Sequence, residues 1–325
     1  MLKMDNGYVV VTGGAGFIGS HLVERLLREG SRVVVMDDCS TGRLENLRGV
    51  MGQEGLSVIP GKISECKELP ELLAGAKFIF HLAAAVGVEL VVNSPIHVIH
   101  TNLQETEAVL AAAAPSKTPV LITSTSEVYG KSQKDVFSEN DDLLIGPPQF
   151  GRWSYACSKL MDEFLALAYA RQHGLPVTIV RLFNTVGPRQ TGSYGMVLPR
   201  FIAAAKRGEP LRVHGDGLQS RCFCYVLDTV EALIRLQKHP EARGEVYNIG
   251  GTEEVTILEL AERVIAELGS ESKVEKVTYQ QAYAPGFEDM RRRKPSVEKL
   301  LAVVGFAPRT SLKEIIQLTA AGGLV

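Results

Sequence analysis

The chain has 325 residues, of which 45% are hydrophobic and 22% are charged, proportions typical of a soluble globular protein with a large core. The 35 lysines and arginines nearly balance 37 acidic residues, and the net charge of −2 argues against a nucleic-acid partner or a polybasic membrane surface. No apolar run reaches the roughly 18 residues that a membrane-spanning helix needs.

The cysteines argue against disulfides and metal. Five of them stand at positions 39, 66, 157, 222 and 224, an odd number without a C-x-x-C pair. We therefore expect neither a disulfide framework nor a zinc site, and no metal, and the cytoplasm is the default location. Cys157 falls within a helical segment, where we expect a small buried residue.

A strand, a glycine turn and a helix open the chain. Tyr8–Thr12 is a β-branched run of the kind found in buried parallel strands, and 20–29 has helical apolar spacing. Between them lie Gly13, Gly16 and Gly19. Glycines at this spacing let the backbone turn tightly, approach a pyrophosphate and pack the helix against the strand. The combination predicts a dinucleotide-binding unit.

The end of the second strand predicts which dinucleotide is bound. The run 32–36 reads as a strand and is followed by Asp37. A carboxylate there accepts hydrogen bonds from both adenosine ribose hydroxyls and repels a 2′-phosphate, which favours NAD over NADP. The nearby Arg43 leaves NADP open, because arginine is able to accept that phosphate.

Further strands recur along the chain, at 57–59, 78–82, 119–123, 177–181 and 246–249, with helical stretches between them. This alternation predicts an α/β fold, a doubly wound parallel sheet of the Rossmann type, with its active site beyond the carboxyl ends of the strands. His81–Ala85 and Ser124–Glu127 follow two such ends. His81 is interpreted as a structural histidine.

Two helices, 102–114 and 155–171, look apolar on more than one face, which predicts a homodimer through them. The second carries Tyr155 and Lys159, which lie on one face because they are four residues apart. A free phenol, with a pKa near ~10, is a poor base at neutral pH, and a neighbouring ammonium favours the phenolate. The pair is then able to take a proton from a sugar hydroxyl. Alone, the same spacing fits a buried ring beside a solvated amine.

Composition changes after residue 181. The stretch 182–226 is rich in glycine, proline and arginine, and arginines on irregular segments suit phosphate or carboxylate recognition, or are simply solvated. A helix is expected over 226–237 and another over 256–268, where Thr256 and Glu259 form a capping box. We predict an NAD-binding domain of residues 1–181 plus about 226–250. A smaller, interleaved α/β substrate domain comprises 182–225 and 251–325.

Together these segments resemble one family, the extended short-chain dehydrogenase/reductases that modify nucleotide sugars. The likeness spans nearly the whole chain and is carried by these motifs: G-x-x-G-x-x-G at 13–19, Asp37, 81–84, S-T-S-E-V-Y-G at 124–130, Tyr155 with Lys159, N-T-V-G-P-R at 184–189 and G-D-G-x-Q-S-R at 215–221.

The resemblance implies roles for individual residues. Thr125 hydrogen-bonds the reacting sugar hydroxyl, Tyr155 removes its proton, and Lys159 holds the nicotinamide ribose and lowers the tyrosine pKa. Asn184, Arg189 and Arg221 are expected near a nucleotide sugar, most commonly UDP-linked, and its diphosphate. The expected NAD contacts are Gly13, Gly16, Phe17, Ile18, Gly19, Asp37, Leu82, Ala83, Ala84, Asn102, Tyr155 and Lys159.

One residue departs from the family pattern. Relatives commonly place an aspartate after the glycine that follows the third strand, where it meets the adenine. This chain has Gly61-Lys62-Ile63. Lys62 cannot accept a proton from the adenine amino group, so that contact is lost or supplied elsewhere.

Three reactions of the family begin with hydride transfer from the sugar C4 to NAD, which leaves a 4-keto sugar. By the same resemblance, 4,6-dehydratases usually carry aspartate then glutamate after the threonine. This chain has Ser126 and Glu127, and the missing aspartate argues against dehydration. Simple 4-epimerases usually have a small uncharged residue where this chain has Glu127. The triplet 125–127, the run 293–296 and the segment 151–155 look most like uronic-acid decarboxylases.

Decarboxylation is chemically coherent with these residues. A C4 ketone makes the C5 carboxylate a β-keto acid, which loses carbon dioxide once the developing enolate is stabilised. Arg293 would hold that carboxylate and offset its repulsion from Glu127, which orients it or relays the proton to C5. Two alternatives stay open: Arg293 is solvated within the basic run 291–294, or it contacts the diphosphate as in related epimerases. A non-catalytic NAD sensor would have lost Thr125, Tyr155 or Lys159, and all three are present.

Overall fold

Seven parallel strands form the central sheet, in the order β11-β6-β5-β4-β1-β2-β3. The computed structural model describes residues 7–191, 196–278 and 290–322. The strands are β1 (Tyr8–Thr12), β2 (Val33–Asp37), β3 (Leu56–Pro60), β4 (Ala76–His81), β5 (Val120–Thr125), β6 (Val177–Leu182) and β11 (Glu245–Ile249). The predicted doubly wound sheet is confirmed, and the strand expected at 246–249 joins it beside β6.

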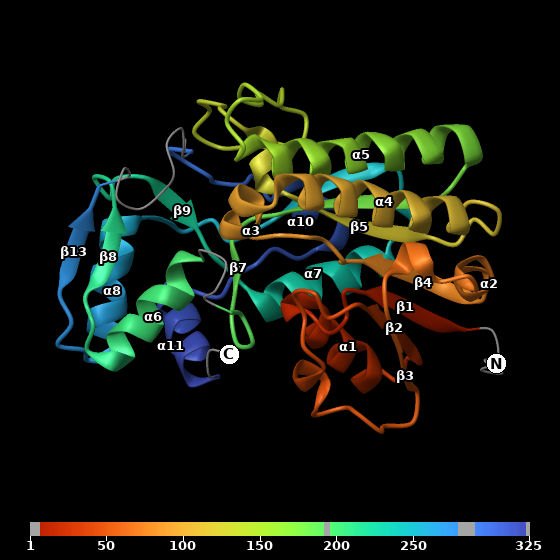
Figure 1. The fold of residues 1–325 in the computed structure, drawn as a ribbon, viewed down its shortest axis with the longest axis horizontal. Coiled ribbons are helices and arrows are strands. Elements are labelled where there is room, and N and C mark those ends of the chain that lie inside the picture. The colour runs from red at the N-terminus through yellow and green to blue at the C-terminus, as the bar shows by residue number, and fades with distance from the viewer. Residues whose placement is uncertain (1–6, 192–195, 279–289, 323–325) are drawn as a thin grey trace.

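Helices cover both faces of this sheet (Figure 1). One face carries α1 (Phe17–Arg28), α7 (Val226–Lys238) and α10 (Glu298–Val304); the other carries α2 (Leu69–Ala74), α4 (Pro95–Ala113) and α5 (Trp153–His173). Within β1, Val9 and Val11 pack on the first face and Tyr8 and Val10 on the second. The strands read as continuous apolar runs because both of their faces are buried.

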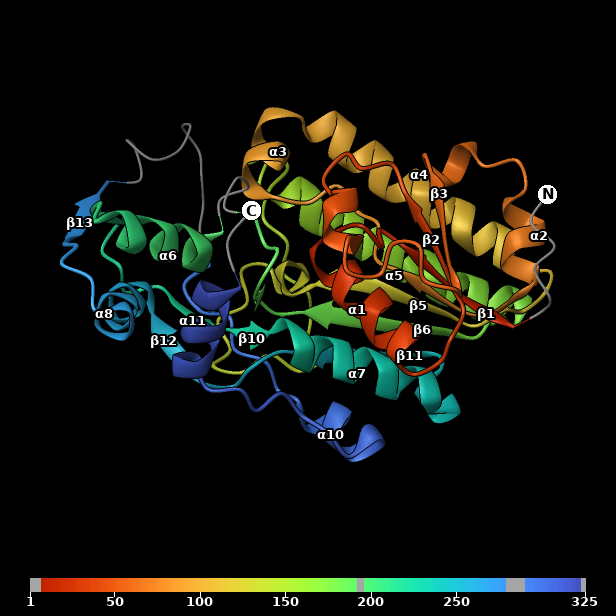
Figure 2. The ribbon, with the colours of Figure 1, turned by 90° about the horizontal axis from the view of Figure 1, so that it is seen from below.

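A second group of elements lies to one side of the sheet (Figures 1 and 2). It comprises β8 (Leu211–His214) paired with β13 (Val274–Val277), β9 (Ser220–Cys222) paired with β12 (Glu254–Thr256), α6 (Val197–Arg207), α8 (Ile257–Leu268) and α11 (Leu312–Ala321). These helices share their own apolar cluster, which includes Leu198, Leu260 and Ile316. Between the two regions, β7 (Thr185–Val186) pairs with β10 (Cys224–Tyr225).

The division into two domains stays a prediction, and helix α10 does not pack in the domain to which its residue range was assigned. The range 251–325 was expected in the smaller domain, yet α10 packs on α7 and β11 and adds Leu300 and Val304 to the core of the large sheet. The predicted capping box is present at the start of α8: Thr256 Oγ1 accepts from the Glu259 N–H at 3.1 Å, and Glu259 Oε2 accepts from the Thr256 N–H at 2.9 Å.

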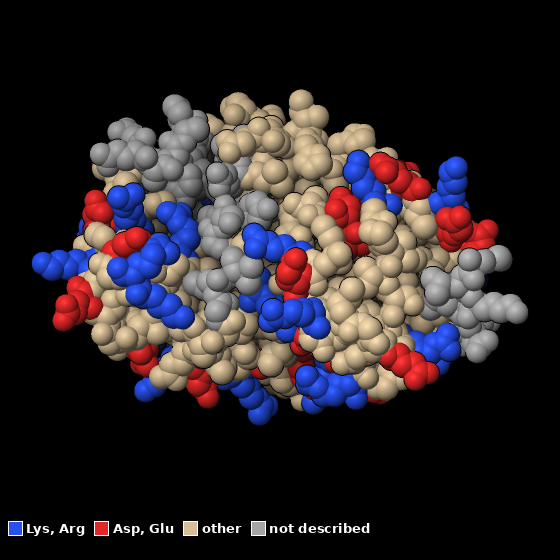
Figure 3. Space-filling view, turned by 60° about the horizontal axis from the view of Figure 1, so that its bottom comes forward, with Lys and Arg blue, Asp and Glu red and all other residues tan. Residues whose placement is uncertain are grey.

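The surface agrees with the balanced charge. On the face in Figure 3, basic and acidic side chains are interspersed. Within the described residues, none of the helices is both long and apolar enough to cross a membrane. The expectation that Cys157 is buried is wrong, because its side chain is exposed on α5. That helix turns Ala156 and Ser158 inward instead, and so position 157 faces away from the core.

Candidate active site

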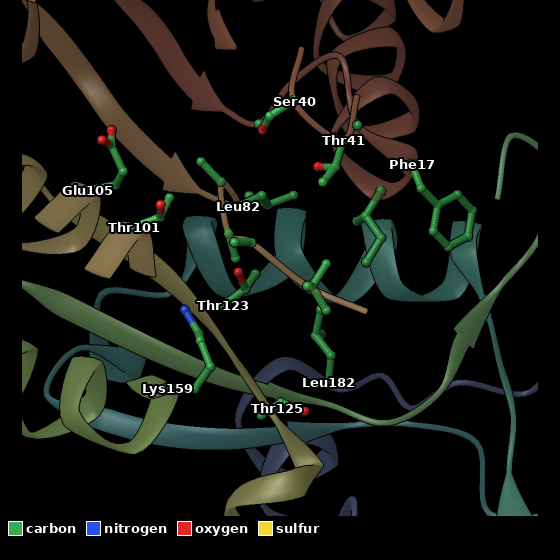
Figure 4. Close-up of a pocket in the computed structure, with 18 of the residues that line it drawn as sticks. Phe17, Ser40, Thr41, Leu82, Thr101, Glu105, Thr123, Thr125, Lys159 and Leu182 are labelled. Atoms are coloured by element: carbon green, nitrogen blue, oxygen red, sulfur yellow. The ribbon is translucent and has the colours of Figure 1, made fainter. Parts of the chain in front are cut away.

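The carboxyl ends of β1, β2, β4, β5 and β6 border one long crevice (Figure 4). Its lining brings together residues that are far apart in the sequence: Gly13, Gly16, Phe17, Ile18, Gly19, Asp37, Leu82, Ala83, Ala84, Thr125, Ser126, Glu127, Tyr155, Lys159, Asn184 and Arg293. Most of the predicted site residues therefore lie along one cavity, whereas Asn102, Arg189 and Arg221 are not among its lining residues.

The glycine turn closes one side of the crevice and has no room for side chains. Gly13 has a φ of +69°, and a Cβ there would lie 2.7 Å from the Ala83 nitrogen. A Cβ on Gly19 would lie 2.1 Å from the Gly13 carbonyl oxygen. Because α1 begins at Phe17, its first backbone N–H groups lack partners within the helix and suit a pyrophosphate. The turn thus fits the dinucleotide expected from the sequence.

Asp37 ends β2 at the edge of this turn. Its carboxylate accepts hydrogen bonds from the Ala15 N–H and the Cys39 N–H, each at 2.8 Å. Burial raises the pKa of this carboxyl group, and these two bonds counteract the effect. Arg43 lines a small adjoining cavity rather than the crevice itself. Of these two residues, Asp37 is the one that lines the crevice.

Asn102, predicted to touch NAD, lies behind the crevice wall. Its side-chain Oδ1 accepts from the Ala85 N–H at 2.8 Å, and its Nδ2 donates to Ser158 Oγ at 3.1 Å. It therefore ties the loop after β4 to α5. His81 is structural, as expected: its ring contacts Thr12 at 2.8 Å and Thr106 at 3.1 Å, and burial lowers its pKa to about 3.

Tyr155, Lys159 and Thr125 all line the crevice. Burial, followed by the charges of Glu127 and Asp162, raises the pKa of the Tyr155 phenol above its ordinary value, and a hydrogen bond with the Thr125 side chain partly counteracts this. Lys159 Nζ donates to Asp162 Oδ2 at 2.7 Å, and this buried ion pair was not expected. In this structure the Lys159 ammonium is therefore paired with Asp162. That it lowers the pKa of Tyr155 stays a prediction.

Glu127 lies in a second cluster next to Tyr155. It belongs to the 3-10 turn η3 (Ser126–Tyr129) directly after β5. Arg293 reaches it from 166 residues away, with Nη1 at 3.3 Å from Glu127 Oε1 and 3.5 Å from Ser126 Oγ. Arg293 Nη2 also donates to Asn184 Oδ1 at 3.1 Å. The arginine is only 12% exposed, so it is not simply one member of a solvated basic run.

The other two predicted substrate arginines have protein partners. Arg189 donates to Glu24 at 2.5 Å and to Ser20 at 3.2 Å, which joins the loop after β7 to α1. It lines the small adjoining cavity. Arg221 is buried in β9 and donates to the backbone oxygens of Ser220 and Met290, each at 2.8 Å.

Three residues at the site were missed in the sequence. Arg152 is buried and has Nη2 at 3.9 Å from Glu127 Oε1, so two guanidinium groups flank this carboxylate. Asp162 stands three residues after Lys159 on α5, a spacing that could have signalled the ion pair. Glu105 lines the crevice from α4, but nothing in the sequence reveals which face of that helix meets it.

Known proteins of similar sequence identify the family to which the chain belongs. Residues 9–250 match the model of the NAD dependent epimerase/dehydratase family. The chain is 44% identical over 313 residues to UDP-N-acetyl-alpha-D-glucosaminuronate decarboxylase of Bacillus cytotoxicus, covering 95% of this chain and 96% of that protein. It is 37% identical to UDP-glucuronic acid decarboxylase 3 of Arabidopsis thaliana over 324 residues, covering 96% and 88%.

A solved structure is similar throughout. The UDP-glucuronic acid 4-epimerase of Bacillus cereus, crystallised with UDP-glucuronic acid and NAD, matches with a TM-score of 0.86 at 27% identity, covering 97% of this chain and 98% of that one. This similar enzyme binds NAD in the same fold. In the present chain that fold contains the glycine turn, Asp37 and the helix that carries Tyr155 and Lys159. The chain belongs to the NAD dependent epimerase/dehydratase family and is an NAD-dependent enzyme.

Proposed function

We propose that this enzyme removes the carboxylate of a UDP-linked uronic acid, with UDP-glucuronate as the first substrate to test. The observation that carries the proposal is the pairing of Glu127 with Arg293 beside Tyr155. The two decarboxylases described above support it through their names and their coverage of nearly the whole chain. UDP-N-acetylglucosaminuronate is the second substrate to test, because the 44% identical relative is named for it.

The first step needs a base at the sugar C4 hydroxyl. NAD, when bound, accepts the hydride from C4. Thr125 hydrogen-bonds the hydroxyl and Tyr155 takes its proton, while Lys159 contacts the nicotinamide ribose and favours the phenolate. The bond between Thr125 and Tyr155 supports this arrangement, because it brings both hydroxyls to one point of the crevice.

The second step needs a cation at the sugar C5 carboxylate. Arg293 holds this carboxylate with two N–H donors, and Arg152 adds a second positive charge close to Glu127. The 4-keto sugar then loses carbon dioxide, the C5 carbanion is stabilised as an enolate, and a proton relayed through Glu127 is added at C5. Ser126, within 3.5 Å of Arg293, helps to fix the guanidinium.

The substrate's nucleotide end is proposed to lie toward Asn184, Arg189 and Arg221. Asn184 already lines the crevice and bonds Arg293, which supports a place close to the sugar. Arg189 and Arg221 would have to exchange their present partners in part, since both are bonded to the protein. For these two residues the proposal depends on a rearrangement upon binding.

A product analysis tests the reaction. The purified enzyme is incubated with UDP-glucuronate, UDP-N-acetylglucosaminuronate and UDP-glucose, and the products are examined by mass spectrometry. From either uronate, decarboxylation is supported by a product lighter by one carbon dioxide, if the hydride returns to C4, or by one carbon dioxide and two hydrogens, if the 4-keto product leaves and the cofactor stays reduced. A product of unchanged mass but altered chromatographic mobility would instead establish 4-epimerisation, the second candidate, which the similar UDP-glucuronic acid 4-epimerase favours. A product that has lost water would establish dehydration.

We also propose a homodimer formed through α4 and α5. Exposed apolar side chains lie along both helices: Cys157, Met161 and Phe164 are spaced on one face of α5, and Ile96 and Ile99 lie on α4. Phe164 is 59% exposed and Ile96 is 83% exposed. These helices pack side by side, and their exposed apolar residues are proposed to meet those of a second copy.

The remaining proposals concern organisation. An NAD-binding domain of 1–181 plus 226–250 and a substrate domain of 182–225 plus 251–325 are supported by the separate apolar cluster around α6, α8 and α11, with α10 assigned to the first. A cytoplasmic location is supported by the five cysteines, which all carry free thiols.

A further inference from the structure

The crevice extends beyond the glycine turn toward β3. In this fold the pyrophosphate lies on the glycine turn and the adenosine ribose at the acidic residue after β2, so the adenine lies farther in the direction of β3. The crevice wall in that direction includes Lys62, Ile63, Thr101 and Glu105. Figure 4 shows Thr101 and Glu105 at the end of the crevice opposite Phe17.

The adenine needs a hydrogen-bond acceptor for its exocyclic amino group. The side chain of Lys62, two residues after β3, carries only donors, and its Nζ lies 3.2 Å from Glu65 Oε1. Leu82 and Ile63 are able to contact the faces of the ring but not its amino group. A side-chain acceptor at this end of the crevice must therefore come from a residue other than Lys62, Ile63 and Leu82.

Glu105 offers that acceptor from α4. Its Oε2 accepts from the Ser64 N–H at 3.0 Å and its Oε1 accepts from Ser64 Oγ at 2.6 Å. Ser64 is the middle residue of the 3-10 turn η2 (Ile63–Glu65), so the carboxylate is fixed by the segment that follows β3. The residue is 7% exposed and lines the crevice. A carboxylate has about four acceptor positions, and Ser64 uses two of them.

We propose that Glu105 accepts a hydrogen bond from the adenine amino group of NAD and thereby selects adenine dinucleotides. A second carboxylate on the crevice is that of Asp38, which is exposed and accepts from the Ser40 N–H of its own turn at 2.9 Å. Glu105 is the better candidate because a buried, fixed carboxylate gains more from such a bond than a solvated one.

The test compares NAD⁺ with nicotinamide hypoxanthine dinucleotide, which has a keto oxygen in place of the amino group. Dissociation constants are measured by calorimetry on cofactor-free protein, without sugar, so the outcome is independent of the decarboxylation proposal. The unmodified enzyme should prefer NAD⁺ by about 10-fold or more, because a keto oxygen facing the carboxylate is repelled. In Glu105→Gln the preference should shrink to within about 3-fold, because an amide serves either group.

Three further variants complete the design. Glu65→Gln, a matched change on the exposed side of η2, should keep the full preference. Asp38→Asn should keep it too. Ser64→Ala leaves the carboxylate but loosens it, and should give an intermediate preference even if Glu105→Gln folds poorly. The proposal is overturned if the unmodified enzyme binds both dinucleotides equally well. It is also overturned if Glu105→Gln or Ser64→Ala weakens the binding of both dinucleotides by the same factor, or if Asp38→Asn alone removes the preference for NAD⁺. Equal weakening would mean that Glu105 only holds η2 in place.

Discussion

Tyr155 is under opposing electrostatic influences. Burial, Glu127 and Asp162 raise the pKa of its phenol, whereas Thr125 and Arg293 lower it. A phenol in such surroundings acts as a base only when cationic charge is brought close to it, which fits a tyrosine that becomes reactive once its partners are assembled.

Replacing the hydroxyl tests that role. Tyr155→Phe should reduce kcat by ~10² or more and leave NAD affinity nearly unchanged, because the change removes a proton acceptor and little contact area. Turnover is measured with UDP-glucuronate, and NAD affinity is measured separately by calorimetry. Turnover comparable to that of the unmodified enzyme would exclude the tyrosine as the base.

Arg293 is the residue that separates the candidate reactions. Arg293→Ala should lower kcat/KM for UDP-glucuronate by ~10² and impair reduction of the cofactor by UDP-glucose far less, because only the uronate presents a carboxylate to the guanidinium. Arg291→Ala is a suitable control, since that side chain is 82% exposed and pairs with Asp216. Equal losses with both sugars would assign Arg293 to the diphosphate and favour the epimerase.

At the scale of elements, α5 arranges three ionisable groups along one face. Tyr155, Lys159 and Asp162 follow each other at helical spacing, and the lysine and aspartate form a buried ion pair. The same helix is fixed to β6 by Glu163, whose carboxylate accepts two bonds from Arg181 at 3.0 and 2.8 Å. The helix whose Tyr155 and Lys159 line the crevice is thus held by buried polar contacts as well as by apolar packing.

Asp162→Asn should move the pH dependence of turnover. The negative charge of Asp162 raises the pKa of Tyr155, so its removal lowers that pKa and the limb that rises with pH shifts to lower pH. Below the midpoint, kcat/KM should increase roughly 3- to 10-fold. Asp141→Asn, a matched change at a largely buried aspartate that is paired with Lys134 and is not among the crevice-lining residues, should leave the profile unmoved. A shift to higher pH in Asp162→Asn, or none, would contradict the phenolate mechanism.

For the whole molecule, the proposed dimer makes a prediction about mass in solution. Phe164→Glu should convert the dimer into a monomer, because two copies would bury the new charges against each other's apolar surface. Leu218→Glu, at a leucine that is equally 59% exposed but lies outside α4 and α5, should remain a dimer. Light scattering after size exclusion gives both masses. A monomeric unmodified protein, or a dimer that survives Phe164→Glu, would refute the interface.

Much of this architecture was predictable because it is encoded locally. The β-branched runs, the glycine turn and the capping box at Thr256 each depend on neighbours within a few residues, and the structure has all of them. Boundaries were less predictable: the helix expected at 102–114 begins at Pro95. Cys157 was misjudged because the exposure of a helical position depends on which layers the helix packs against.

The sequence by itself determined the order of strands and helices, the dinucleotide turn and the spacing of Tyr155 and Lys159, since each follows from short-range periodicity and backbone sterics. Only the tertiary structure decided that Arg293 meets Glu127 across 166 residues, that Glu105 meets Ser64 across 41, and that Arg189 bonds α1. Contacts of this kind arise when distant elements pack, and no local pattern of residues specifies them.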